Sequence, residues 1–178
     1  MPAKHFIVNP RTGDVQTLAE WEKYVNENSD VDITDAQCVL VIPEEGIPFA
    51  FPKKSLGSMD WKSAAEAVKS AVVPLPDEFL AKFSTGVEVR LPSRAQGSWI
   101  GECNYALPDD ELPDTTLDET LEAIGGEQFC GAIFWSSSRF SASNAWCFGG
   151  GAGFAYNSYL YSGFRALPVL LCPGAKRP

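Results

Sequence analysis

The feature that most constrains the fold is an aromatic stretch at residues 134–169, FWSSSRFSASNAWCFGGGAGFAYNSYLYSGFRALPV. It holds ten of the chain's 21 aromatic residues, and its only charged residues are Arg139 and Arg165. Short apolar runs separated by Gly and Ser predict short strands joined by long loops, not helices. We expect antiparallel strands at residues 133–136, 144–148, 154–157 and 164–171.

Many aromatic side chains on a backbone rich in Ser, Gly and Asn are typical of antibody-like binding surfaces. Tyr and Phe give a large contact area for little rotamer entropy, and the small polar residues give adaptable hydrogen bonding. The competing interpretation is that Tyr156, Tyr159, Tyr161 and Phe164 fill a core. A strand there would place Phe154, Tyr156 and Ser158 on one face. The sequence favours a binding module over an enzyme.

The net charge of −9 is unevenly distributed. Residues 1–127 hold all 23 acids and ten bases, a formal charge of −13, whereas residues 128–178 hold four bases and no acid. These bases are not clustered as phosphate binding requires, so no nucleic-acid partner is expected. No apolar run approaches the ~20 residues of a membrane span, and no export signal is visible at the start, although processing can remove one.

Cysteine and histidine usage argues against a zinc site, because five cysteines and a single histidine, His5, form no C-x-x-C pattern. An odd cysteine count without an export signal favours reduced thiols. The acidic loop at residues 108–114 is a conceivable calcium site. It lacks the D-x-D-x-D-G spacing, so a solvated loop is the simpler interpretation. We expect no metal and no cofactor.

Residues 1–55 predict a small α+β appendage. It consists of a strand at 5–9, a Pro/Gly turn with a short return strand, a helix at 18–26 and a hairpin of residues 37–42 and 47–51. The helix begins at a capping box on Thr17. Pro48 indicates that the second hairpin strand lies at a sheet edge.

The pattern becomes more helical after residue 56. Ser58 is the expected cap of a helix with Trp61 and Val68 on its apolar face. A short helix is expected after Pro76, and capping boxes at Ser93 and Thr116 predict two more. These elements indicate an α+β fold with short helices around a small antiparallel sheet.

Six segments occur in a recognisable order: Trp61 with Ala64 and Ala65, Arg90-Leu91-Pro92-Ser93, residues 121–127 (LEAIGGE), Phe134-Trp135-Ser136-Ser137, Asn144-Ala145-Trp146, and residues 165–169 (RALPV). Together they resemble the C-type-lectin-fold family of bacterial and phage proteins with the pattern R-L-P-T, I-G-G-E, Y-W-S-S-T-E, N-A-W and R-V-R-P-V. That family includes variable proteins of diversity-generating retroelements, such as the phage major tropism determinant. The resemblance covers residues 58–171. It departs where Ser138-Arg139 replaces Thr-Glu and Ala166-Leu167 replaces Val-Arg.

The resemblance implies a C-type-lectin-like domain at residues 56–173, after the appendage at 1–55 and before a tail at 174–178. It also implies a variable display region at 134–169, because retroelement mutagenesis acts on adenines and therefore diversifies Asn codons. Framework residues beneath this region would be Trp135, Trp146, Ala155, Arg165 and Pro168. The predicted ligand-binding residues are Arg139, Phe140, Ala142, Ser143, Cys147, Gly149, Gly151, Phe154, Tyr156, Ser158, Tyr159, Tyr161, Ser162 and Phe164.

The implied function is binding of a protein or glycan on another cell or host surface, from a phage virion or a bacterial surface. A homo-oligomer is compatible with it. One alternative is a carbohydrate-binding adhesin of fixed specificity, without the E-P-N or Q-P-D motif of calcium lectins. The other is a thiol oxidase resembling the formylglycine-generating enzyme, with Cys147 and Cys172 as its cysteines. No nearby His or Lys precedes either cysteine in the sequence to lower its pKa, so we expect no catalytic residues.

Overall fold

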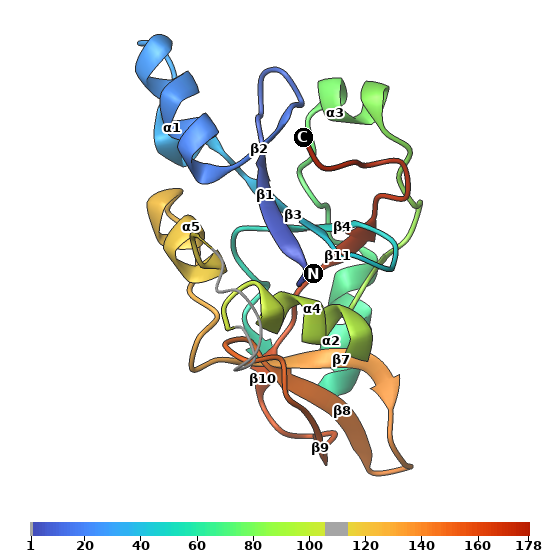
Figure 1. Cartoon of the computed structure of the whole chain (residues 1–178). Coiled ribbons are helices and arrows are strands. Elements are labelled where there is room, and N and C mark those ends of the chain that lie inside the picture. Colours follow the sequence, from blue (N-terminus) through green and yellow to red (C-terminus); the bar gives the residue numbers. More distant parts are fainter. Residues whose placement is uncertain (1, 106–113) are drawn as a thin grey trace.

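The computed structural model describes residues 2–105 and 114–178, which form an α+β structure with two β-sheets (Figure 1). One sheet contains, in spatial order, β2 (Val15–Gln16), β1 (Lys4–Val8), β3 (Cys38–Ile42), β4 (Phe49–Pro52), β11 (Val169–Leu171) and β6 (Val89–Arg90). The other contains β5 (Ser58–Met59), β10 (Phe164–Arg165), β7 (Ile133–Arg139), β8 (Asn144–Gly149) and β9 (Ala155–Tyr159). The predicted acidic loop lies outside the described residues, except for Asp114.

The helices are α1 (Leu18–Glu27), the 3-10 helix η1 (Ile33–Asp35), α2 (Trp61–Lys69), α3 (Asp77–Lys82), α4 (Arg94–Glu102) and α5 (Leu117–Ala123). The capping boxes predicted at Thr17, Ser93 and Thr116 are all present, at the starts of α1, α4 and α5. The cap of α2 was predicted wrongly as Ser58. Asp60 holds that position, because its carboxylate accepts a hydrogen bond from the backbone N–H of Ser63 at 2.9 Å.

The N-terminal segment shares a sheet with the rest of the chain. β4 pairs with β11 through Leu170↔Ala50 and Leu171↔Phe49, so the sheet continues across the predicted boundary at residue 55. The edge position inferred from Pro48 is wrong, because β4 lies between β3 and β11. Pro48 precedes the strand, where its missing N–H costs no ladder bond, and its carbonyl accepts from the N–H of Cys172 at 2.7 Å.

The single strand expected at residues 164–171 is two strands in different sheets. β10 pairs with β7 and β5, and β11 pairs with β4 and β6. Pro168, which cannot donate to a ladder, lies between them at the crossing. The β7–β10 pairing is parallel, unlike the antiparallel arrangement predicted.

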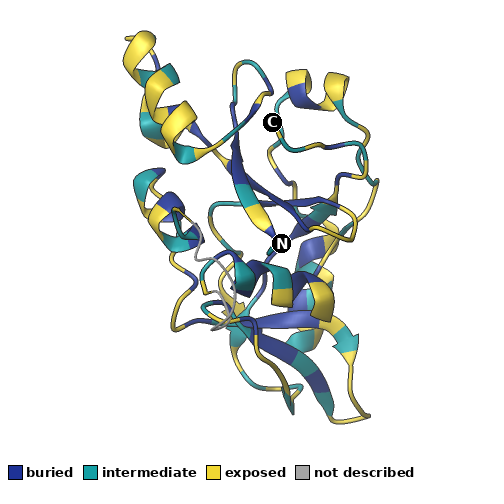
Figure 2. Ribbon diagram, viewed as in Figure 1, coloured by how far each residue is buried: buried dark blue, intermediate teal, exposed yellow. Residues whose placement is uncertain are grey.

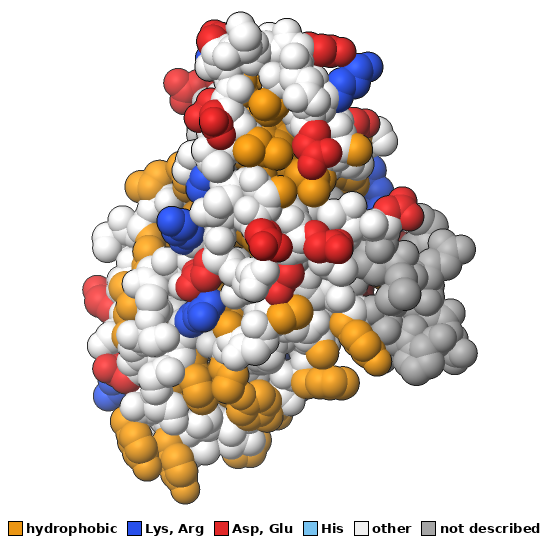
Figure 3. Space-filling view, turned by 90° about the vertical axis from the view of Figure 1, so that its left-hand side faces the viewer, with side chains coloured by type: hydrophobic (Ala, Val, Ile, Leu, Met, Phe, Trp, Pro, Cys, Tyr) orange, Lys and Arg blue, Asp and Glu red, His pale blue; other side chains and the backbone are white. Residues whose placement is uncertain are grey.

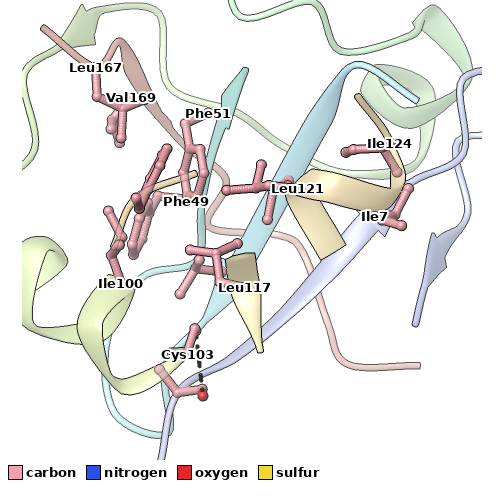
Figure 4. Close-up of a cluster of buried hydrophobic side chains, with 14 of the residues drawn as sticks. Ile7, Phe49, Phe51, Ile100, Cys103, Leu117, Leu121, Ile124, Leu167 and Val169 are labelled. Carbon is pink, nitrogen blue, oxygen red and sulfur yellow. Dashed lines mark hydrogen bonds between the residues drawn. The ribbon is translucent and has the colours of Figure 1, made fainter. Parts of the chain in front are cut away.

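Successive side chains of β3 point to opposite faces of the larger sheet, and both faces are buried. Val39 and Val41 face the main core, whereas Cys38, Leu40 and Ile42 face a second cluster beneath α3. The main core lies between this sheet, α4 and α5 (Figure 4).

The two sheets are joined by a series of buried rings. Ring centroids are 5.6 Å apart for Phe51 and Phe129, 4.5 Å for Phe129 and Phe134, and 5.5 Å for Phe134 and Phe148. Contacts at these distances stabilise beyond the area they bury. The smaller sheet is therefore anchored to the main core through its strands β7 and β8.

His5, the only histidine, makes folding stability depend on pH. Its Nε2 lies 2.8 Å from Thr120 Oγ1, and burial lowers its pKa from 6.5 to about 4, with Glu119 acting in the opposite direction. Between pH 6.5 and about 4 the unfolded chain takes up a proton on His5 and the folded chain does not, so protonation favours unfolding. The contribution of neutral His5 to folding stability is therefore complete above pH 6.5 and is lost as the pH falls towards about 4. We expect the urea midpoint to fall between about pH 7 and about pH 5. The variant His5→Gln should show a flatter profile, and an equal slope in both proteins would contradict this assignment.

Candidate binding surface

Five large side chains at one end of the molecule are exposed: Phe140 (54%), Phe154 (69%), Tyr156 (41%), Tyr159 (55%) and Tyr161 (78%). We call these five rings the aromatic surface. They belong to β9 and to the segments beside β7, β8 and β9, at the end of the molecule opposite α1 (Figures 1 and 2). In the space-filling view, hydrophobic side chains gather at this lower end, and most visible acidic side chains lie above them (Figure 3).

The register of β8 and β9 determines where each side chain points. Cys147 pairs with Tyr156 and Ala145 with Ser158, so these four side chains share one face. Asn157 and Tyr159, with their β8 partners, lie on the opposite face. Phe154 precedes the strand, so of the three residues expected on one face only Tyr156 and Ser158 lie on β9. Exposed rings therefore project from both faces of an edge strand.

Polar and aromatic contacts hold the exposed groups in place. Asn144 Nδ2 donates to Asn157 Oδ1 at 3.0 Å, across the β8–β9 pair. The rings of Tyr159 and Tyr161 are stacked at 5.2 Å with an interplanar angle of 5°. Phe140 makes an edge contact with Trp146, with centroids 5.3 Å apart.

The implied framework residues differ in burial. Trp135 is fully buried, and its Nε1 donates to the carbonyl of Met59 at 2.8 Å. Arg165 pairs with Glu127 at 3.0 Å and donates to the carbonyl of Gln128. Pro168 is buried and Trp146 is partly buried. Ala155 was expected beneath the surface but is exposed, because it lies on the outermost strand.

The remaining predicted binding residues are distributed unequally. Arg139, Ala142 and Ser143 are exposed; Gly149, Gly151, Ser158, Ser162 and Phe164 are partly buried. The hydroxyls of Ser158 and Ser162 lie 3.0 Å apart, and the Phe164 ring packs on Trp135. Cys147 is fully buried beneath the sheet, so its side chain adds nothing to the exposed surface.

Cys147 and Cys172 lie apart and do not form a pair. All five thiols are free, and only Cys130 among them is exposed. Cys147 and Cys172 belong to separate clusters of buried side chains. Burial raises the pKa of Cys147 to about 11 and that of Cys172 to about 12, which disfavours the nucleophilic thiolate. These positions give no support to a thiol oxidase built on Cys147 and Cys172.

One residue beside the aromatic surface was missed from the sequence. Arg94, the first residue of α4, places its guanidinium carbon 3.7 Å from the ring centroid of Trp146. Because Arg94 and Trp146 are far apart in the sequence, this contact could not be predicted from it. A second exposed arginine makes a similar contact: the guanidinium carbon of Arg139 lies 5.5 Å from the ring centroid of Trp61.

Within residues 2–105 and 114–178 there is no group of three or more His, Cys, Asp and Glu side chains placed to hold a metal ion. No helix in the same part of the chain is long and apolar enough to cross a membrane. In comparisons with known proteins, neither a family model nor a curated protein sequence matched this chain.

Proposed function

We propose that this protein binds a protein or a glycan on another cell or host surface through its aromatic surface. The observation that carries the proposal is the exposure of five large rings at one end of the molecule. A single exposed ring is ordinary in a monomer, but a group of them marks an interaction site. Tyr and Phe are also enriched at the cores of protein interfaces.

The support beneath the rings favours binding without large rearrangement. The sheet that ends in β9 is firmly packed: on its strands β7 and β8, the exposed fraction is at most 1% for Phe134, Trp135, Cys147 and Phe148. Close-packed side chains hold their backbone in one arrangement. A preorganised surface loses less conformational entropy on binding than a flexible one.

We further propose, from the sequence resemblance, a C-type-lectin-like domain whose display region is diversified by a retroelement. Such diversification would leave a near-copy of the coding segment for residues 134–169 beside a reverse transcriptase gene, differing only at adenines. A carbohydrate-binding adhesin of fixed specificity would leave no such copy, and the binding role itself would remain.

The test is to replace Tyr156, Tyr159 and Tyr161 together by Ala and to measure binding on glycan and cell-surface protein arrays. Because interface rings supply much of the binding energy, we expect affinity to fall by about 100-fold or more. The melting temperature should stay nearly unchanged, since all three side chains are exposed.

The matched control replaces Val72, Leu80 and Val87, exposed hydrophobic residues from other parts of the chain, by Ala. This control should bind like the unmodified protein. Full binding by the tyrosine variant would refute the proposal. A large fall in its melting temperature would show instead that the rings support the core.

A further inference from the structure

One face of the β8–β9 pair carries three of the five rings in a row of neighbouring side chains that ends at a cation. The contacts run from Arg94 to Trp146, from Trp146 to Phe140, across the Asn144–Asn157 hydrogen bond, and to the stacked pair of Tyr159 and Tyr161. The register places Trp146 opposite Asn157 and Asn144 opposite Tyr159, so these side chains share this face. We call this set the Arg94 patch.

The guanidinium of Arg94 is available for binding. It is exposed and covers the face of the Trp146 ring. Within the described parts of the chain, its side chain makes no ion pair and donates no hydrogen bond. Contact with a ring occupies the face of a guanidinium but not its N–H donors, which match the two oxygens of a carboxylate. By contrast, Arg165 is already engaged by Glu127.

The charge of the segment that supplies most of the patch favours an anionic partner. Residues 128–178, which supply every other member of the patch, contain no Asp or Glu. A carboxylate approaching Arg94 would therefore meet no repulsion from this segment, and the neighbouring Trp146 and Phe140 reduce the solvation of the ion pair. Electrostatic complementarity of this kind gives specificity and faster association.

The form of the surface favours a protein over a glycan as the source of the carboxylate. Exposed rings project from both faces of β9, and the clefts beside α1 and beside β6 include none of the five rings. Small ligands bind mainly in concave sites, whereas protein interfaces are broad and enriched in Tyr, Trp, Phe and Arg.

We propose that Arg94 is a binding residue of this surface, and that the Arg94 patch recognises an Asp or Glu side chain flanked by apolar residues on a protein partner. This inference rests on the proposed function. It adds a residue from α4, outside the display region, and it specifies an acidic partner.

The test uses a random-peptide display library selected on the unmodified protein, after removal of peptides that bind the triple tyrosine variant. We expect the selected peptides to be enriched in Asp and Glu beside apolar residues. For one such peptide, the variant Arg94→Gln should weaken binding by about tenfold, the scale of a charge-assisted hydrogen-bonded pair. Binding of the same peptide with Gln in place of its acid should be unaffected by this substitution.

Two further variants separate charge from geometry. Arg94→Lys should retain part of the affinity, because it keeps the charge and loses the fork of donors. Arg11→Gln, which removes an exposed arginine paired with Asp30 in the N-terminal segment, should bind the acidic peptide normally.

The outcomes distinguish this inference from the proposed function. Peptides that need the tyrosines but are not acidic, or that bind Arg94→Gln as well as the unmodified protein, would overturn the role of Arg94 and leave the proposed function standing. Arg94-dependent binding of sialylated glycans without surface-dependent peptides would overturn the protein partner. Selection of no surface-dependent binder, by peptide or glycan, would count against both.

Discussion

Replacing Gly101 by Ala should destabilise the protein by about 3 kcal/mol and lower its melting temperature by roughly 10 °C. Gly101 lies in α4, where an added Cβ would overlap the backbone of Ala152 and Gly153. The obstacle is backbone, so a change of rotamer cannot relieve it. Gly153 itself lies against α4, where an added Cβ would be 2.9 Å from the backbone of Gly97 and Ser98, so the loop is closely packed on the helix. The overlap outweighs the gain of about 1 kcal/mol in helix propensity from Gly to Ala.

Gly149→Ala is the matched control, because no atom lies within 4 Å of the Cβ it would add. Its stability should change by no more than about 0.5 kcal/mol. Differential scanning calorimetry of both variants measures the contrast. Equal melting temperatures would show that α4 does not pack against the 149–154 loop as described.

Replacing Trp135 by Ala should cost about 4 kcal/mol, because a fully buried ring would leave a cavity. The change also removes the hydrogen bond to the carbonyl of Met59 and the contact with Phe164, at 4.7 Å between ring centroids. Trp135→Phe keeps most of the ring and should cost about half as much. Chemical denaturation of the three proteins gives these differences.

Replacing Trp146, on the adjacent strand, should reduce stability much less. It is partly exposed and contacts Arg94 and Phe140, so Trp146→Ala should cost only about 1 kcal/mol of stability. We expect the same variant to lose affinity for surface-dependent ligands. If the two tryptophan variants lost stability equally, the distinction between a buried support and an exposed patch would be wrong.

Local chemistry made much of the fold predictable. Three capping boxes located α1, α4 and α5, because each sets a helix start through hydrogen bonds within four residues. The assignment of β10 and β11 to different sheets was not predictable, since strand partners are chosen by long-range packing. For the same reason Pro48 was wrongly assigned to an edge strand.

For the candidate site, residue type predicted exposure well where glycines and serines surround the rings, as at Phe154 and Tyr161. It failed at Cys147, because a strand with one covered face buries alternate residues whatever their type. Arg94 could not be found from the sequence, because its partner ring lies on a different element and the contact depends on how α4 crosses β8. Its contribution to the surface is a product of tertiary structure alone.

The crossing at Pro168 has a consequence for synthesis on the ribosome. β10 lies between β5 and β7 and β11 lies between β4 and β6, so both sheets lack an internal strand until residues 164–171 have emerged. Neither sheet can therefore be completed before this segment is available, and one short stretch of chain completes both. The five exposed rings all precede this stretch, so replacing them leaves unchanged the residues that complete both sheets.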